Sequence, residues 1–187
     1  MYKSFLGLVA LTLVFISCKK EQSPFEIGKQ HIGFLTDSTQ VKDLETIFGN
    51  DSIVKFISGD EFIGSKNNIN IFEKGGKKLP VLTPKQALDS TSVIESVQII
   101  DPRYKTAKNI SAVSTFKDVS NAYKVSKINN LINSVLITVN ELNGSFAMDK
   151  KELPANLRFD MNLNIEAMHI PDNAKFKYFF INWNDTN

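Results

Sequence analysis

The chain has 187 residues, 42% of them hydrophobic, with 22 basic and 20 acidic side chains and a formal net charge of +2. This near-neutral balance argues against a nucleic-acid-binding protein, which usually carries a basic face, and the length suits one domain with a sizeable core. A single cysteine excludes a disulfide framework, which needs at least two.

The first seventeen residues have the pattern of an export signal. Lys3 supplies a positive charge, and an apolar run from Phe5 to Ile16 follows it, shorter than the roughly 20 residues of a membrane span. Ser17-Cys18 then resembles the lipobox of bacterial lipoproteins, in which a diacylglycerol is attached to the cysteine thiol and a signal peptidase cuts before it. The resemblance implies cleavage between Ser17 and Cys18 and lipidation of Cys18, so residues 1–17 are expected to be removed.

The residues after Cys18 indicate where the anchored protein goes. Lys19 is not the aspartate that retains enterobacterial lipoproteins in the inner membrane, so we expect an outer-membrane protein held through its N-terminal lipid. Lys19 to Gln22 also resembles the charged surface-export signal of Bacteroidota lipoproteins, so the periplasmic face and the cell surface both stay open. Residues 18–25 are expected to form a tether, and residues 26–187 a single globular domain.

In the first half of this domain, hydroxyl residues precede Val41-Lys42-Asp43-Leu44 and indicate the start of a helix that reaches Phe48. Period-two alternation predicts a strand over 68–74, and Gly75-Gly76 predicts a tight turn into a second strand over 77–82. Thr83-Pro84 predicts a short helix through Leu88, because proline suits the first helical turn.

In the second half, Thr115 and Asp118 have the spacing of a capping box and predict a helix that begins at Phe116. Alternation predicts strands over 135–140 and 159–166, and an apolar run predicts a final strand over 178–183.

The two halves also share short patterns. The helix start at Val41 is matched by the one at Phe116, and Ile94–Asp101 is matched by Ile165–Asp172. The expected fold class is therefore α+β, with two tandem repeats at about 32–106 and about 110–183, each a helix followed by antiparallel strands.

Several landmarks together resemble a known family. They are Ile32–Thr36, the helix that ends at Phe48-Gly49, the strand Ile94–Asp101, the run from Ile110 to Val119, and the closing Phe179–Trp183. In this order they resemble the small envelope lipoproteins of enterobacteria described as regulated by the envelope-stress sigma factor, a family of unknown function. The resemblance implies no catalytic residue.

Residue types that carry chemistry are sparse. His31 and His169 lie far apart and have no metal-ligand spacing, and no serine stands in a nucleophile motif. Gly75-Gly76 followed by two lysines lacks the spacing of a phosphate loop, so the hairpin interpretation is favoured. We therefore expect no enzyme, no cofactor and no metal.

Three Asp-Ser pairs resemble the O-glycosylation acceptor pattern of Bacteroidota, with Ser38, Ser52 and Ser90 as the acceptors. Helix caps and turns favour the same dipeptide, so both interpretations stay open.

The leading expectation is a non-catalytic envelope lipoprotein that binds another envelope protein or maintains the envelope. The alternative is a lipoprotein that binds a small ligand or a glycan, suggested by the phenylalanine-rich strands and by Tyr104 and Trp183, which we expect to be exposed. An enzyme of unrecognised type is a third hypothesis.

Overall fold

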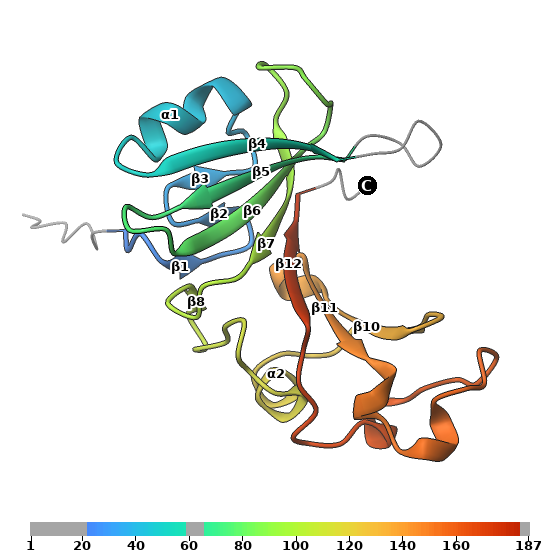
Figure 1. The fold of residues 1–187 in the computed structure, drawn as a ribbon. Helices are drawn as coiled ribbons and strands as arrows, with labels where there is room; N and C mark the ends of the chain where they lie inside the picture. Colours follow the sequence, from blue (N-terminus) through green and yellow to red (C-terminus); the bar gives the residue numbers. More distant parts are fainter. Residues whose placement is uncertain (1–21, 59–65, 184–187) are drawn as a thin grey trace, which may run out of the picture.

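The computed structural model describes residues 22–58 and 66–183, and most of their regular structure is β-sheet. The larger sheet has eight antiparallel strands, which form two meanders, β4–β7 and β9–β12, that meet where β7 pairs with β12. In Figure 1, β4 to β6 run across the picture and β10 to β12 run down it, so the sheet changes direction at this junction. The strands in spatial order are β4 (Ser52–Ser58), β5 (Lys66–Phe72), β6 (Lys78–Pro84), β7 (Ile94–Ile99), β12 (Tyr178–Asn182), β11 (Gly144–Asp149), β10 (Ser134–Val139) and β9 (Lys127–Asn130).

The smaller sheet and the helices are built from short elements. Its four strands, in spatial order, are β3 (Leu35–Thr36), β2 (His31–Ile32), β1 (Glu26–Ile27) and β8 (Lys105–Thr106). Within residues 22–58 and 66–183, the α-helices are α1 (Leu44–Ile47) and α2 (Phe116–Ala122). The 3-10 turns are η1 (Val41–Asp43), η2 (Asn140–Leu142), η3 (Lys150–Glu152), η4 (Ala155–Leu157) and η5 (Ala167–His169).

One face of the eight-stranded sheet forms the core. Along β5, β10, β11 and β12, alternate residues are buried, because successive side chains of a strand point to opposite faces. Ile27 of the small sheet, Leu44 of α1 and Phe116 of α2 belong to the same hydrophobic cluster and cover this face. The opposite face, here called the open face, carries half-buried and mostly polar side chains.

The structure contradicts the expected α+β fold of two tandem helix-plus-strand repeats. The helices span only 4 and 7 residues, and the fold is mostly β, with sheets of eight and four strands. The proposed match between Ile94–Asp101 and Ile165–Asp172 also fails, because only the first forms a strand. In the second, Glu166 and His169 form a capping box around η5, and Pro171 has no amide hydrogen to donate to a sheet.

Two local predictions are wrong. Thr83-Pro84 ends strand β6 and does not open a helix. The predicted strand over 159–166 is an irregular loop, in which Phe159 is 87% exposed. The Asn130 side-chain amide donates to the backbone carbonyls of Asp160, Met161 and Leu163 and so takes the acceptors that a neighbouring strand would need.

Other local predictions are confirmed. Gly75 and Gly76, with φ of 117° and 88°, turn the chain between β5 and β6 in a conformation that glycine adopts without strain. The strands predicted at 135–140 and 178–183 are β10 and β12. The capping box of α2 is present, and the Asp118 carboxylate accepts from the Thr115 amide at 2.8 Å.

Removing this cap gives a first testable prediction. Thr115→Ala is expected to lower the free energy of unfolding by about 1 kcal/mol, because the helix loses the side chain that accepts from the Asp118 amide. Urea denaturation of the variant measures the change. Ser120→Ala on the exposed side of the same helix is the control and should leave stability nearly unchanged, since alanine is a good helix former. Equal losses in both variants would contradict the capping role.

Candidate functional site

A groove crosses the open face at the centre of the eight-stranded sheet. We call it the sheet groove; its volume is about 610 Å³. It lies over the junction between the two meanders, where strands β7 and β12 are neighbours. Its lining residues come from five strands and one connection, and they are Asn68, Val81, Thr83, Pro84, Lys85, Ala87, Glu95, Ser96, Gln98, Ser145, Tyr178, Phe180 and Asn182.

Strand register places four polar side chains of this groove in one line, here called the polar row. Thr83 is paired with Ser96, and Ser96 with Asn182, while Asn68 on β5 is hydrogen-bonded to Thr83 from the other side. Adjacent strands lie about 4.8 Å apart, so four side chains on four strands extend over roughly 14 Å. Because all four stand on strands, the sheet backbone fixes their spacing.

Hydrogen bonds hold the polar row in two pairs. The Thr83 hydroxyl donates to the Asn68 carbonyl oxygen at 3.1 Å, and the Ser96 hydroxyl donates to the Asn182 carbonyl oxygen at 3.2 Å. The Asn182 amide then donates to the Ser145 hydroxyl at 3.0 Å. These bonds orient the side chains. The amide hydrogens of Asn68 and the hydroxyl hydrogen of Ser145 make no hydrogen bond to any of the described residues.

A second line of side chains runs beside the polar row. Gln98 lies between Val81 and Phe180 in register, and Phe180 is paired with Ser145. The Gln98 amide and the Tyr178 hydroxyl make no hydrogen bond to any residue in 22–58 or 66–183. The rings of Tyr178 and Phe180 lie 5.9 Å apart with an interplanar angle of 46°. The groove therefore combines unused amide and hydroxyl groups with two aromatic rings.

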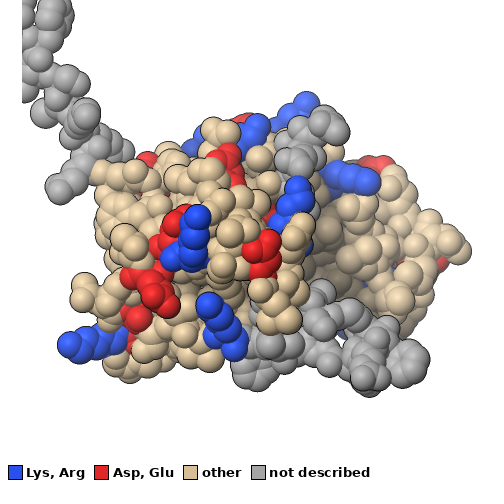
Figure 2. Space-filling view, turned by 90° about the horizontal axis from the view of Figure 1, so that it is seen from above, with Lys and Arg blue, Asp and Glu red and all other residues tan. Residues whose placement is uncertain are grey.

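Charge is nearly absent from the sheet groove. Lys85 and Glu95 are the charged residues among those that line it, and they have opposite signs. Both lie near the irregularity where the register of β6 and β7 shifts between Thr83 and Pro84. Elsewhere on the molecule, basic and acidic side chains are interspersed, as Figure 2 shows for the face seen from above.

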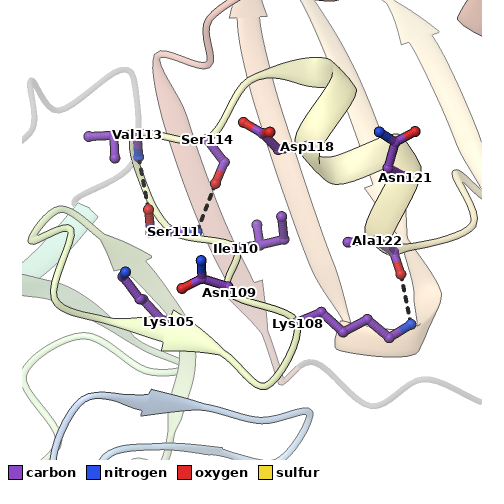
Figure 3. Close-up of a pocket in the computed structure, with 10 residues that line it drawn as sticks. All are labelled: Lys105, Lys108, Asn109, Ile110, Ser111, Val113, Ser114, Asp118, Asn121 and Ala122. Carbon is purple, nitrogen blue, oxygen red and sulfur yellow. Dashed lines mark hydrogen bonds between the residues drawn. The ribbon is translucent and has the colours of Figure 1, made fainter.

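A second hollow of about 670 Å³ lies between helix α2 and the segment that follows β8 (Figure 3). Its polar groups are largely used by the local backbone. The Ser114 hydroxyl accepts from the Ser111 amide, the Ser111 hydroxyl accepts from the Val113 amide, and the Lys108 ammonium donates to the Ala122 carbonyl at 2.7 Å. These contacts stabilise a loop and a helix end, so we favour the sheet groove as the functional site.

The predicted modification sites fall in separate places. Ser17 and Cys18 lie outside the described residues. Ser38, Ser52 and Ser90 are all exposed, after β3, at the first residue of β4 and in the connection between β6 and β7. A glycosyl acceptor must be accessible, so their exposure is compatible with modification, which stays a prediction. None of the three lines the sheet groove.

The two histidines and the two aromatic residues considered in the sequence analysis lie outside the sheet groove. The His169 Nδ1 accepts from the Glu166 amide at 3.0 Å, and His31 belongs to β2. Across the part of the chain that the structure describes, no three His, Cys, Asp or Glu side chains lie close enough to hold a metal ion.

Tyr104, expected to be exposed, is only 4% exposed, and burial raises the pKa of its hydroxyl to about 12. The Trp183 indole is half-buried and donates to the Lys29 carbonyl at 3.1 Å.

The sequence did not single out the sheet groove. Asn68, Ser96 and Asn182 each occupy a polar position of a strand, which is the ordinary pattern of a sheet with one solvated face. Their alignment depends on the pairing of β7 with β12, whose hydrogen-bonded side chains Ser96 and Asn182 are 86 residues apart in the chain. Nothing local to either strand specifies that pairing.

Comparison with known proteins identifies a fold but no family. No family model and no curated protein match the chain. Among solved structures it is similar to the crystal structure of the uncharacterized protein yfeY from Escherichia coli, with a TM-score of 0.54, 13% identity, and coverage of 84% of this chain and 99% of that chain. At this identity the similarity shows a shared fold alone. Within 22–58 and 66–183, no helix is long and apolar enough to cross a membrane.

Proposed function

We propose that this chain is a lipid-anchored, non-catalytic binding protein of the bacterial outer membrane, whose sheet groove takes up another component of the envelope. The observation that carries the proposal is the groove itself: about 610 Å³ of volume, in which neutral polar side chains on strands lie beside apolar and aromatic ones. Groups of this kind orient a bound molecule in a pocket and give the site its selectivity.

The contacts inside the groove favour binding over catalysis. A serine nucleophile needs an adjacent base to take its proton. The Ser96 hydroxyl donates to the amide oxygen of Asn182, which is not a base, and the Ser145 hydroxyl accepts from the same amide group. The hydroxyl groups are therefore arranged as hydrogen-bonding partners and not as activated nucleophiles.

The anchor and the groove use separate parts of the chain. The first described strand, β1, pairs with β2 and β8 in the small sheet and contributes no residue to the groove. A tether that enters at β1 therefore leaves the open face of the large sheet accessible. This separation supports a protein that is held at a membrane by one end and binds with another surface.

Lipid attachment can be tested directly. Cys18→Ala is expected to abolish incorporation of radioactive palmitate and to move the protein from the membrane fraction to the supernatant, because acyl chains provide the stable anchor. Ser17→Ala is the matched control: alanine keeps a small residue before the cysteine, so labelling and fractionation should stay unchanged. Palmitate labelling that persists in Cys18→Ala, or wild-type protein in the supernatant, would contradict the proposal.

A further inference from the structure

We infer that the sheet groove binds a neutral oligosaccharide, with Asn68, Gln98 and Ser145 hydrogen-bonded to the sugar hydroxyl groups and the Tyr178 and Phe180 rings against the faces of the sugar rings. This inference rests on the proposed function and names the class of ligand.

The first argument is the match of donors and acceptors. A sugar hydroxyl both donates and accepts, and side-chain amide and hydroxyl groups do the same, whereas a carboxylate only accepts and an ammonium only donates. Asn68, Gln98 and Ser145 keep unused hydrogen-bonding capacity toward the groove among the described residues. A ligand with many neutral hydroxyl groups can pair with all three.

The second argument is the aromatic pair at the end of the groove near Tyr178. Tyr178 is 39% exposed and Phe180 is half-buried, so both rings offer a surface to a ligand. Sugar rings have apolar C–H faces as well as hydroxyl edges, and a tilted pair of aromatic rings contacts such faces without needing charge.

The third argument excludes other occupants. The lining contains one basic and one acidic side chain, Lys85 and Glu95, so the groove has no excess of one charge that would favour an anion or a cation. A lipid chain could not pair with the unused amide and hydroxyl groups of Asn68, Gln98 and Ser145, which it would cover at a cost in free energy. An extended peptide binds by adding a strand to a sheet edge, but the groove lies over β6, β7 and β12, whose backbone groups are already paired on both sides.

The test uses the full-length lipidated protein in detergent micelles. Chitotetraose, cellotetraose and maltotetraose are the neutral probes, and an oligogalacturonate is the anionic probe; binding is measured by isothermal titration calorimetry. We expect at least one neutral tetrasaccharide to bind and the oligogalacturonate to bind at least tenfold more weakly. For the same tetrasaccharide, Phe180→Ala is expected to raise Kd about tenfold, because the ring contact is lost.

A matched pair of amide variants completes the test. Gln98→Ala removes a groove amide and is expected to raise Kd about fivefold, as one neutral hydrogen bond is lost. Asn129→Ala removes an amide from β9 on the same open face, outside the groove, and should leave Kd unchanged.

The inference is overturned if none of the three tetrasaccharides binds, or if Phe180→Ala and Gln98→Ala bind them as the wild type does. Loss of sugar binding in Asn129→Ala to the same extent would also overturn it. If none of the three sugars binds, but photo-crosslinking in the envelope captures a molecule at the groove, only the ligand class is rejected. If the sugars do not bind and no crosslink forms at the groove, the binding function itself is rejected.

Discussion

Replacing Phe179 by alanine is expected to lower the free energy of unfolding by about 3 to 5 kcal/mol, because a large side chain leaves a cavity in a close-packed core. Phe179 is 1% exposed and stacks on Phe146 with ring centroids 4.3 Å apart and an interplanar angle of 12°. It stands on β12, the strand that joins the two meanders, with Ile99 of β7 as its partner in register. Its removal weakens the contact between the two halves of the sheet.

The control for this prediction is the same chemical change at Phe159. That residue is 87% exposed in the loop after η4, so Phe159→Ala should change stability by no more than about 0.5 kcal/mol. Chemical denaturation of both variants measures the difference. Similar losses at the two positions would contradict the arrangement in which residues 159–166 form an exposed loop and Phe179 lies in the core.

Replacing Arg103 by methionine is expected to lower the free energy of unfolding by about 3 kcal/mol, since it leaves a buried carboxylate without its main partner. The side chain of Asp101 is completely buried. It accepts from Arg103 Nη2 at 2.7 Å, from the Arg103 amide at 2.9 Å and from Lys77 Nζ at 3.0 Å. Arg103 also forms two bonds with Glu73 and lies 4.5 Å from the Phe25 ring centroid, so it connects the N-terminal segment to the β5–β6 hairpin.

A matched control separates this buried cluster from ordinary surface ion pairs. Lys117 forms a 2.7 Å salt bridge with Asp172, but the two side chains are 58% and 71% exposed. Lys117→Met should therefore cost less than about 1 kcal/mol. Adding Asp101→Asn to Arg103→Met should recover part of the lost stability, because the buried charge is removed as well. No recovery in the double variant would contradict the explanation by an unpaired charge.

The stability that this cluster provides is expected to depend on pH, because Asp101 binds a proton less readily in the folded protein than in the unfolded chain. Burial raises the pKa of Asp101, but hydrogen bonds from Arg103 and Lys77 outweigh this effect and hold the pKa at about 2, below the usual 3.8. The unfolded chain therefore binds the proton more readily, and stability falls as pH decreases from about 4 to about 2. The loss over this range is on the order of 2 kcal/mol from this residue. Arg103→Met should show a smaller fall, because its Asp101 pKa is less depressed.

Features of the fold that depend on contacts between residues close together in the chain could be predicted from the sequence. The capping box at Thr115 and the alternation of β10 depend on residues close together in the chain, and both are confirmed. The same alternation failed at Phe159, because a distant side chain, Asn130, binds the backbone carbonyls there. The short patterns that suggested two repeats describe common residue types and carried no information on sheet pairing.

The candidate site was harder to predict because it depends on long-range pairing. Tyr104 was expected to be exposed, but it packs edge-on against Phe25 at 5.0 Å in the core beside Arg103. The groove rings, Tyr178 and Phe180, belong to the apolar run that predicts the final strand, now β12. Only the register with β7 shows that Phe180 lies beside Gln98, on the open face.

The measurement that tests the binding function most directly is photo-crosslinking in the native envelope. A benzophenone amino acid replaces Ala87, which is exposed at the rim of the sheet groove, or Ala107, which is also exposed but lies outside the groove. We expect a discrete crosslinked product from position 87 that Phe180→Ala diminishes, and none from position 107. No product at position 87, or the same product at both positions, would contradict a ligand site in the sheet groove.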